Sequence, residues 1–492
     1  MMEKQDSYSH VLKYTGIFGG VQGLNILVGL VRNKLVALIL GPGGMGLASL
    51  FSSALKMVGD STNLGLPVSA VKDLSAVYEK GDFRRVAEIV MVVRSWCLLT
   101  AFAGMLLCMA ASPLLSRWTF GDSVHTLQFV LLGPAVAFTA ISGGEAAILK
   151  ATRQLRKLAM TSIFSVFSAL LISVPLYYFL GILGVVPVLV AVALAQAAVT
   201  MAYSFRLYPF RLSFRPALLG RGLSTVRLGA SFVVAGFFAS VGEFLIRSYL
   251  NHSCQMETVG LYNSGYYMTV VYAGLVFSAM ETDYFPRLSA ISQTGRKFNE
   301  VVNRQIEISF LVLSPMLVAF IICAPVLLPL LYSGKFMPVL GMVQVAALSM
   351  YMRVVYLPIE YIPLSRGDSF VFMTMELIAV SLLVGFVVAG HSLFGLVGTG
   401  YGITASSLLE VCIVAFYYGR RYHYALSRNL LKYIAVQIPI GILAYCVTFI
   451  DNLMAYCLAG GALFCVSLWL SFAVVKRESD LFDKIKSKFL KR

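Results

Sequence analysis

The sequence predicts an all-α polytopic membrane protein with about fourteen transmembrane helices. Of its 492 residues, 59% are hydrophobic and only 13% are charged, whereas about 25% of an average soluble domain is charged. The apolar residues gather in runs of roughly twenty, the length that a helix needs to cross about 30 Å of hydrocarbon. A water-soluble surface cannot be built from this composition, so membrane-spanning helices are the primary prediction.

Each apolar run between two polar breaks predicts one helix. The first run passes Ala37 and reaches Leu40 without a small-residue cleavage site, so we expect it to be retained as an insertion signal. The longest external loop, about Ser112–Thr126, is too short for a soluble domain. The predicted helices are 14–40, 44–68, 87–111, 127–149, 159–180, 183–205, 228–250, 258–280, 305–331, 339–363, 370–390, 395–418, 432–450 and 454–475.

The positions of the basic residues predict the orientation of these helices. With the N-terminus in the cytoplasm, most of the 39 Lys and Arg residues fall on cytoplasmic segments, and only Arg117 and Lys335 fall on external loops. An even number of crossings then places both termini in the cytoplasm. The basic clusters are explained by topology and by contact with anionic membrane lipids. The net charge of +16 does not indicate nucleic-acid binding, because these residues share no soluble face.

Cysteine, histidine and glycine patterns give no sign of a cofactor or a metal. All of the eight cysteines except Cys254 lie inside apolar runs, where they serve as small packing residues, and the five histidines are scattered. Gly41–Gly46 matches the GxGxxG pattern of dinucleotide sites, but it follows a membrane helix and has no strand before it. We interpret this segment as a tight external turn between the first two helices.

A weak internal repeat relates the first six helices to the next six. Arg32 is followed by Gly46-Leu47, and Arg247 is followed at almost the same distance by Gly260-Leu261. Two six-helix lobes related by an axis along the membrane normal, around a central cavity, are typical of duplicated transporters. The predicted organisation is a first lobe at 1–205, a basic cytoplasmic linker at 206–227, a second lobe at 228–418, and two extra helices with a basic tail at 419–492.

Ionisable residues inside the predicted helices are candidate site residues. Each costs about 2.5–3.5 kcal/mol or more at a helix centre, so such groups face protein or water and often mark a pathway. They are Arg32, Lys34, Lys56, Asp60, Arg94, Glu145, Glu243, Arg247, Arg353 and Glu360.

We expect the cations Arg32, Lys34, Lys56 and Arg247 to line the cavity and to bind an anionic headgroup, since Arg and Lys both bind phosphate. The alternative is mutual neutralisation, because Lys56–Asp60 and Glu243–Arg247 are each four residues apart on a helix.

The sequence holds no Walker motif, so transport would be secondary. Asp60, Glu145 and Glu243 are therefore candidate sites for coupling to H+ or Na+, and the alternative role of each is that of a counter-ion.

Six stretches carry a resemblance to a known family: Thr15–Gly20, Val31–Lys34, Leu40–Gly46, Asn63–Gly65, Ala70–Asp73 and Gly260–Tyr266. They resemble the Wzx-type O-antigen translocases of the multidrug/oligosaccharidyl-lipid/polysaccharide (MOP) exporter superfamily. The resemblance implies an inner-membrane flippase, not an enzyme, that moves undecaprenyl-diphosphate-linked oligosaccharide from the cytoplasmic to the outer leaflet by alternating access. It also implies that the diphosphate meets Arg32, Lys34, Lys56 and Arg247, and that the polysaccharide polymerase machinery is a candidate partner.

Three other function classes fit the sequence less well than the flippase. A multidrug and toxin exporter of the same superfamily is a poorer match, because the cations predicted in the cavity outnumber the anions. A membrane polysaccharide polymerase or ligase would need a large external loop with catalytic residues, and the sequence predicts none. A structural scaffold would explain neither the repeat nor the intramembrane charges. The last two helices, 432–450 and 454–475, could form a lateral groove or add lipid-facing surface.

Overall fold

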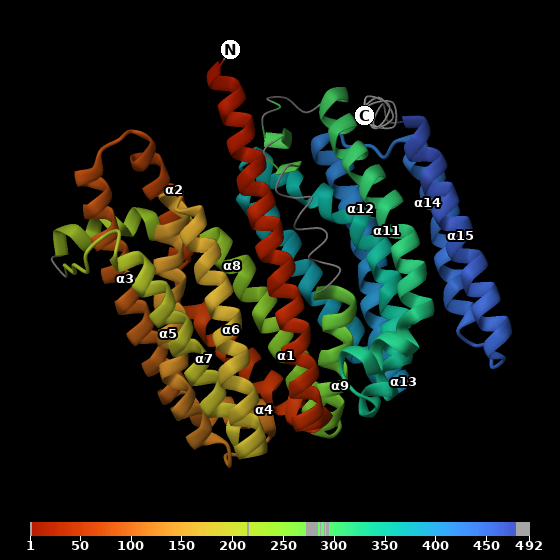
Figure 1. Cartoon of the computed structure of the whole chain (residues 1–492), viewed down its shortest axis with the longest axis horizontal. Coiled ribbons are helices and arrows are strands. Elements are labelled where there is room, and N and C mark those ends of the chain that lie inside the picture. Colours follow the sequence, from red (N-terminus) through yellow and green to blue (C-terminus); the bar gives the residue numbers. More distant parts are fainter. Residues whose placement is uncertain are drawn as a thin grey trace. The chain divides into compact units, whose positions relative to one another are not determined.

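The computed structural model describes the backbone of residues 2–213, 216–271, 284–285, 287–289, 291 and 295–478. Within these ranges the regular structure is entirely helical, without a strand, which confirms the predicted class (Figure 1). The elements are α1 (Met2–Thr62), α2 (Leu66–Glu79), α3 (Phe83–Ala110), α4 (Ser112–Phe120), α5 (Thr126–Ala151), α6 (Leu155–Leu180), η1 (Gly181–Gly184), α7 (Val185–Phe205), α8 (Pro216–Ser253), α9 (Met256–Tyr266), η2 (Tyr267–Val271), α11 (Arg296–Leu331), η3 (Gly334–Val339), α12 (Leu340–Arg366), α13 (Ser369–Tyr422), α14 (Arg428–Val447) and α15 (Leu453–Glu478).

Nine helical ranges in the described part of the chain are long and apolar enough to cross a membrane. Three of them, 23–62, 156–205 and 369–422, have 40, 50 and 54 residues. One crossing takes only about twenty residues. These three ranges therefore each provide two crossings, as the predicted fold requires.

Two glycines bend the long helices where the sequence predicts a turn. Gly41 in α1 has φ 66° and ψ −174°, and Gly395 in α13 has φ 60° and ψ −143°. Glycine adopts positive φ without the steric penalty of a side chain. Pro42 then starts the next helical arm, where its missing N–H is not needed. Each bend separates two of the predicted helices.

The end of the second predicted helix differs from the expectation of 44–68. The helix stops at Thr62, and α2 is a separate helix that the sequence analysis did not predict. Leu64 and Gly65 take positive φ of 49° and 66°, and the Asn63 Oδ1 atom accepts a 2.8 Å hydrogen bond from the Gly65 N–H. This Asn-centred turn ends the helix. The predicted loop 112–126 likewise contains the short helix α4.

Packing within the described chain divides it into two units, residues 1–260 with 331–335 and residues 261–330 with 336–492. In the first unit, α3, α5 and α7 lie side by side, and α1 packs against α6 and α8 (Figure 1). Phe51, Phe129 and Leu132 are buried at the centre of one apolar cluster. Leu66 and Leu74 bury one side of α2 against α3 and α5 in a second cluster.

The two repeat-related glycines meet in the first unit. The Gly46 Cα of α1 lies so close to the Met256 carbonyl of α9 that an added Cβ would clash with it, and the Gly260 Cα stands in the same relation to the Pro42 carbonyl. Helices approach this closely only where side chains are missing. The paired Gly-Leu signature in the sequence therefore corresponds to a main-chain contact between α1 and α9.

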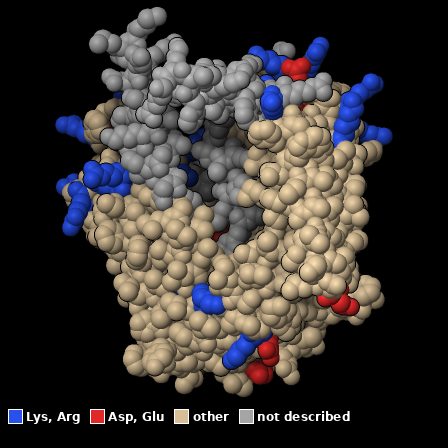
Figure 2. Space-filling model, turned by 45° about the vertical axis from the view of Figure 1, so that its right-hand side comes forward, with Lys and Arg blue, Asp and Glu red and all other residues tan. Residues whose placement is uncertain are grey.

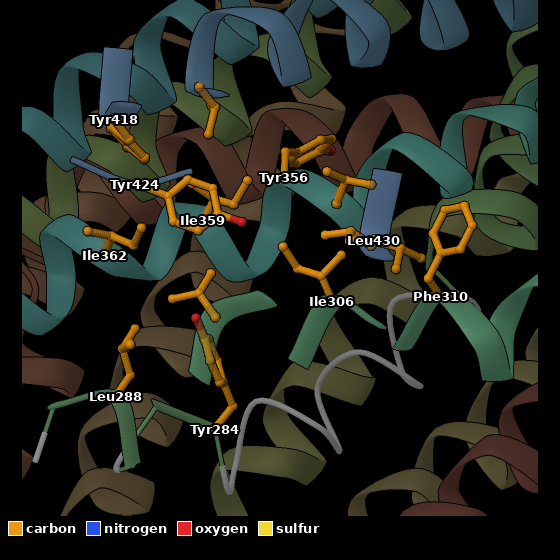
Figure 3. Packing of buried hydrophobic residues seen from close by; sticks show 14 of the residues in the cluster. Tyr284, Leu288, Ile306, Phe310, Tyr356, Ile359, Ile362, Tyr418, Tyr424 and Leu430 are labelled. Carbon is orange, nitrogen blue, oxygen red and sulfur yellow. The ribbon is translucent and has the colours of Figure 1, made fainter. Parts of the chain in front are cut away.

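The second unit has its own large apolar core, formed mainly by α11, α12, α13 and α14 (Figure 3). Phe310, Ile359 and Leu430 are completely buried there. The Tyr284 hydroxyl donates a 2.8 Å hydrogen bond to the Pro358 carbonyl. The helices α14 and α15 lie side by side, and Figure 1 draws both in blue.

The outer surface of the described helices is apolar, as lipid contact requires. Large side chains such as Phe179, Leu183 and Trp469 are 80%, 78% and 67% exposed. On the face drawn in Figure 2, Lys and Arg side chains gather around the upper part, and most of the surface below them carries no charge. An exposed apolar surface of this extent is typical of a protein embedded in a bilayer.

Candidate functional site

The structure brings Lys56, Glu243 and Arg247 together on two packed helices of the first unit. The Lys56 Nζ atom of α1 donates a 3.0 Å hydrogen bond to the Glu243 Oε1 atom of α8, and Arg247 Nη1 lies 3.1 Å from Glu243 Oε2. The Glu243 carboxylate therefore pairs with two of the cations that were predicted to bind an anionic headgroup. The Lys56 side chain is 49% exposed, whereas that of Arg247 is only 6% exposed. Lys56 is the accessible end of this ion-pair network.

Asp60 joins the same group one helical turn after Lys56. Its Oδ1 atom accepts a 3.4 Å hydrogen bond from the Asn63 side-chain amide, and the carboxylate lies within electrostatic range of Lys56 and Glu243. The hydrogen-bonded partner of Lys56 is Glu243 across the helix pair, instead of the i,i+4 neighbour Asp60 that the sequence suggested. We call Lys56, Asp60, Glu243 and Arg247 the α1–α8 cluster. It contains two cations and two anions.

Arg32 and Lys34 lie on α1 before the bend at Gly41, and both are partly buried. The Arg32 Nε atom donates a 3.0 Å hydrogen bond to the Ser173 hydroxyl of α6, and the guanidinium lies within electrostatic range of Tyr177. The structure therefore places Arg32 against α6 of the first unit.

Glu145 of α5 is bound to Arg94 of α3 in a buried bidentate pair. The Nε–Oε1 distance is 2.8 Å and the Nη2–Oε2 distance is 3.1 Å, and the two side chains are 3% and 5% exposed. Arg94 Nη1 also donates 3.0 Å hydrogen bonds to the carbonyls of Tyr208 and Pro209. This geometry makes Glu145 the counter-ion of an arginine that holds the segment after α7.

Two intramembrane carboxyl groups were not predicted: Glu376 and Glu410, on the two arms of α13. Glu360 of α12, Glu376 and Glu410 lie within electrostatic range of one another. Each stands alone in an apolar run, at 370–390 and at 395–418, so the rule that found Glu360 would also have found them. Arg353 of α12 lies within electrostatic range of all three.

An apolar groove of about 610 Å³ runs between α1, α3, α4 and α8 of the first unit. Met57, Trp118 and Phe244 are among its lining residues. Trp118 is 53% exposed, and a large open apolar surface in a membrane protein is suited to acyl chains. Among the residues that the structure describes, no three His, Cys, Asp or Glu side chains are placed to hold a metal ion.

Comparison with known proteins identifies a family and a fold. The model of a family described as polysaccharide biosynthesis protein matches residues 84–340. A search of curated proteins found no match. The fold is similar to that of the lipid II flippase MurJ in an inward closed conformation, with a TM-score of 0.72, 13% identity, and coverage of 94% of this chain and 99% of that one.

Two further solved structures share the fold. One is an inward-facing multidrug resistance transporter of the MATE family of the MOP superfamily, with a TM-score of 0.68, 15% identity, and coverage of 83% of this chain and 96% of that one. The other is a mutant of the MATE transporter VcmN from Vibrio cholerae, with a TM-score of 0.61, 13% identity, and coverage of 87% and 99%. At these identities the likeness concerns the fold.

Proposed function

The chain belongs to the family of polysaccharide biosynthesis proteins, and we propose that it is a flippase for undecaprenyl-diphosphate-linked oligosaccharide. The substrate moves from the cytoplasmic to the outer leaflet of the bacterial inner membrane, and both termini lie in the cytoplasm. The family match and the fold shared with transporters, one of them a lipid II flippase, support this proposal. The main structural support for the proposal is that two cations, Lys56 and Arg247, lie together on membrane helices of this chain.

The α1–α8 cluster supplies a mechanism for binding a diphosphate. Glu243 acts as the resident anion in the absence of substrate, and a phosphate group that approaches the exposed Lys56 competes with it. The Arg247 guanidinium then donates paired hydrogen bonds to the phosphate oxygens. Arg32 and Lys34 add positive charge along α1, and alternating access follows from motion of the lobes 1–205 and 228–418 about the linker 206–227.

Coupling to an H+ or Na+ gradient drives the cycle in this proposal. When an anionic substrate displaces Glu243 from Lys56, the carboxylate needs another positive partner, and a proton or a sodium ion can serve. Asp60 of the same cluster is the second candidate. Glu145 contributes as the counter-ion of Arg94, since its carboxylate is already engaged by two guanidinium nitrogens.

The proposal is tested by measuring lipid-linked oligosaccharide on the cytoplasmic leaflet of cells that lack this gene. We expect accumulation in the deletion strain, rescue by the wild type, and no rescue by an Arg32→Ala/Lys56→Ala variant at equal membrane abundance. Lys335→Ala removes an exposed cation outside the cluster and is the matched control, which should rescue. An unchanged level of lipid-linked oligosaccharide in the deletion strain would contradict the flippase.

A second candidate, a multidrug and toxin exporter, is favoured by the fold shared with MATE transporters. The same deletion strain separates the two functions. Greater sensitivity to small toxic cations without a change in lipid-linked oligosaccharide would support the exporter. The flippase requires the opposite pattern.

A further inference from the structure

The apolar groove between α1, α3, α4 and α8 is long and open at the protein surface. On α8 its lining runs from Phe237 to Ser248, which at about 1.5 Å per residue follows the helix for about 16 Å. Its volume of about 610 Å³ is typical of a small-molecule pocket. Leu114, Trp118 and Leu245 in its walls are each about half exposed. The groove is therefore accessible to a chain-like molecule from outside the protein.

Ser248 lies in the wall of this groove and carries a buried hydroxyl. The residue is only 6% exposed, and its Oγ atom has no hydrogen-bond partner among the described residues. Buried hydroxyls are almost always hydrogen-bonded, because desolvation without a partner is unfavourable. The Ser61 hydroxyl, also in the lining, already donates a 2.7 Å hydrogen bond to the Val58 carbonyl. Ser248 is therefore a hydrogen-bond donor available to a molecule in the groove.

A cation borders the same end of the groove. Arg117 directly precedes Trp118 on α4 and lies one helical turn after Leu114, and both of these neighbours line the groove. The Arg117 side chain is exposed, so its guanidinium is accessible. Figure 1 draws α4 at the end of the first unit that lies away from α2. The sequence predicts that this end faces the exterior.

A hydrogen bond between α4 and α8 indicates the order of these groups along the groove. The Asn251 Nδ2 atom of α8 donates a 3.0 Å hydrogen bond to the Thr119 carbonyl of α4, so the end of α4 is level with the last turn of α8. Ser248 precedes Asn251 by one turn, about 4.5 Å further from the helix end. The apolar lining continues inward to Phe237. From its mouth inward, the groove thus offers a cation, a hydroxyl donor and an apolar channel.

We propose that this groove binds an anionic glycerophospholipid of the outer leaflet. Arg117 contacts the lipid phosphate, the Ser248 hydroxyl donates to an ester carbonyl of the glycerol linkage, and the acyl chain extends inward along the groove. A polyprenyl diphosphate fits this order less well, because its chain is joined directly to the phosphate and has no carbonyl one turn below it. The groove lining contains none of the four residues of the α1–α8 cluster, so the lipid site does not depend on the proposed flippase activity.

The test uses bromine, which quenches tryptophan fluorescence on contact, with Trp118 as the reporter in the groove wall. The chain has three tryptophans, and Trp96→Phe/Trp469→Phe leaves only Trp118. This full-length reporter protein is placed in equimolar liposomes of phosphatidylcholine and phosphatidylglycerol, with brominated acyl chains on either one lipid or the other. One cation near a membrane surface favours an anionic lipid about fivefold. Brominated phosphatidylglycerol should therefore quench Trp118 more strongly than brominated phosphatidylcholine.

Matched variants separate the headgroup contact from general exposure to lipid. Arg117→Gln in the reporter protein should make the two brominated lipids quench equally. Lys335→Gln removes the other cation that the sequence predicts to be external, and it should leave the excess quenching unchanged. A second reporter protein, Trp96→Phe/Trp118→Phe, keeps only Trp469, which is 67% exposed on α15. Both lipids should quench Trp469 equally.

Ser248→Ala tests the ester contact, because it removes only the hydroxyl oxygen. Unbrominated ether-linked phosphatidylglycerol has no ester carbonyl, so it should relieve the quenching of Trp118 less than the ester-linked lipid does. In Ser248→Ala the two competitors should relieve it equally.

Three results would overturn the proposal: equal quenching of Trp118 by the two brominated lipids, excess quenching that survives Arg117→Gln, or equal relief by ester and ether lipids while Ser248 is intact. Relief by a trace of undecaprenyl phosphate would also overturn it and would assign the groove to a polyprenyl chain. None of these measurements involves transport, so their outcome is independent of the flippase assay.

Discussion

At the scale of single residues, burial separates two kinds of ion pair in the first unit. The Arg94–Glu145 pair is almost completely buried, whereas Lys56 is half exposed in its pair with Glu243. Removal of one partner from a buried pair leaves an uncompensated charge, but an exposed pair contributes little to stability because water replaces the lost partner. The first pair should therefore matter for folding and the second for substrate.

Arg94→Ala should destabilise the protein by about 3–5 kcal/mol, because it leaves the Glu145 carboxylate and the Tyr208 carbonyl without their donor. The measurement is thermal unfolding of the purified protein, followed by tryptophan fluorescence. The double variant Arg94→Met/Glu145→Leu removes both charges and should recover part of the loss. An Arg94→Ala protein that is as stable as the wild type would show that the pair is structurally unimportant.

Lys56→Ala should change the stability by less than about 1 kcal/mol, since the side chain is half exposed. Rescue of lipid-linked oligosaccharide export should nevertheless be lost. Lys56→Arg keeps the charge and should restore part of the activity. If Lys56→Ala exported normally, the diphosphate would have to bind elsewhere.

At the scale of helices, hydropathy predicts where crossings occur, but it does not predict local turns or partners. The bends at Gly41 and Gly395 could be predicted, because glycine interrupts two long apolar runs. The break at Asn63–Gly65 was missed because the helix was extended by hydropathy to residue 68, although Asn63 and Gly65 are typical turn residues. The sequence identifies Lys56 and Glu243 as candidate site residues. It does not predict that they pair, because their contact joins two helices far apart in the chain.

Gly46→Ala tests the main-chain contact between α1 and α9. The added methyl group has no room beside the Met256 carbonyl, and forced overpacking typically costs about 1–3 kcal/mol. The neighbouring Gly43 is the matched control, since nothing lies within 4 Å of an added Cβ there. Gly43→Ala should leave stability unchanged or raise it slightly, as alanine favours helix. Equal unfolding temperatures for the two variants would argue against the contact.

At the scale of the whole molecule, the distribution of basic residues predicts the orientation of the chain in the membrane. A fusion of alkaline phosphatase to the C-terminus should be inactive, because that enzyme needs the oxidising exterior, and a fluorescent protein at the same position should be bright. A fusion at Arg117, in a segment that the sequence predicts to be external, should show active phosphatase. The reverse pattern at the C-terminus would mean an odd number of crossings or an inverted chain.

The glycine contact between α1 and α9 also has a mechanical consequence. Where two helices touch through main-chain atoms, no interdigitated side chains have to separate before the helices move. A change in the angle between them therefore does not require rotamers to rearrange there, whereas sliding brings a bulky residue against the partner's backbone. We expect this point to act as a fulcrum: α1 and α9 can rock about it but cannot slip past each other.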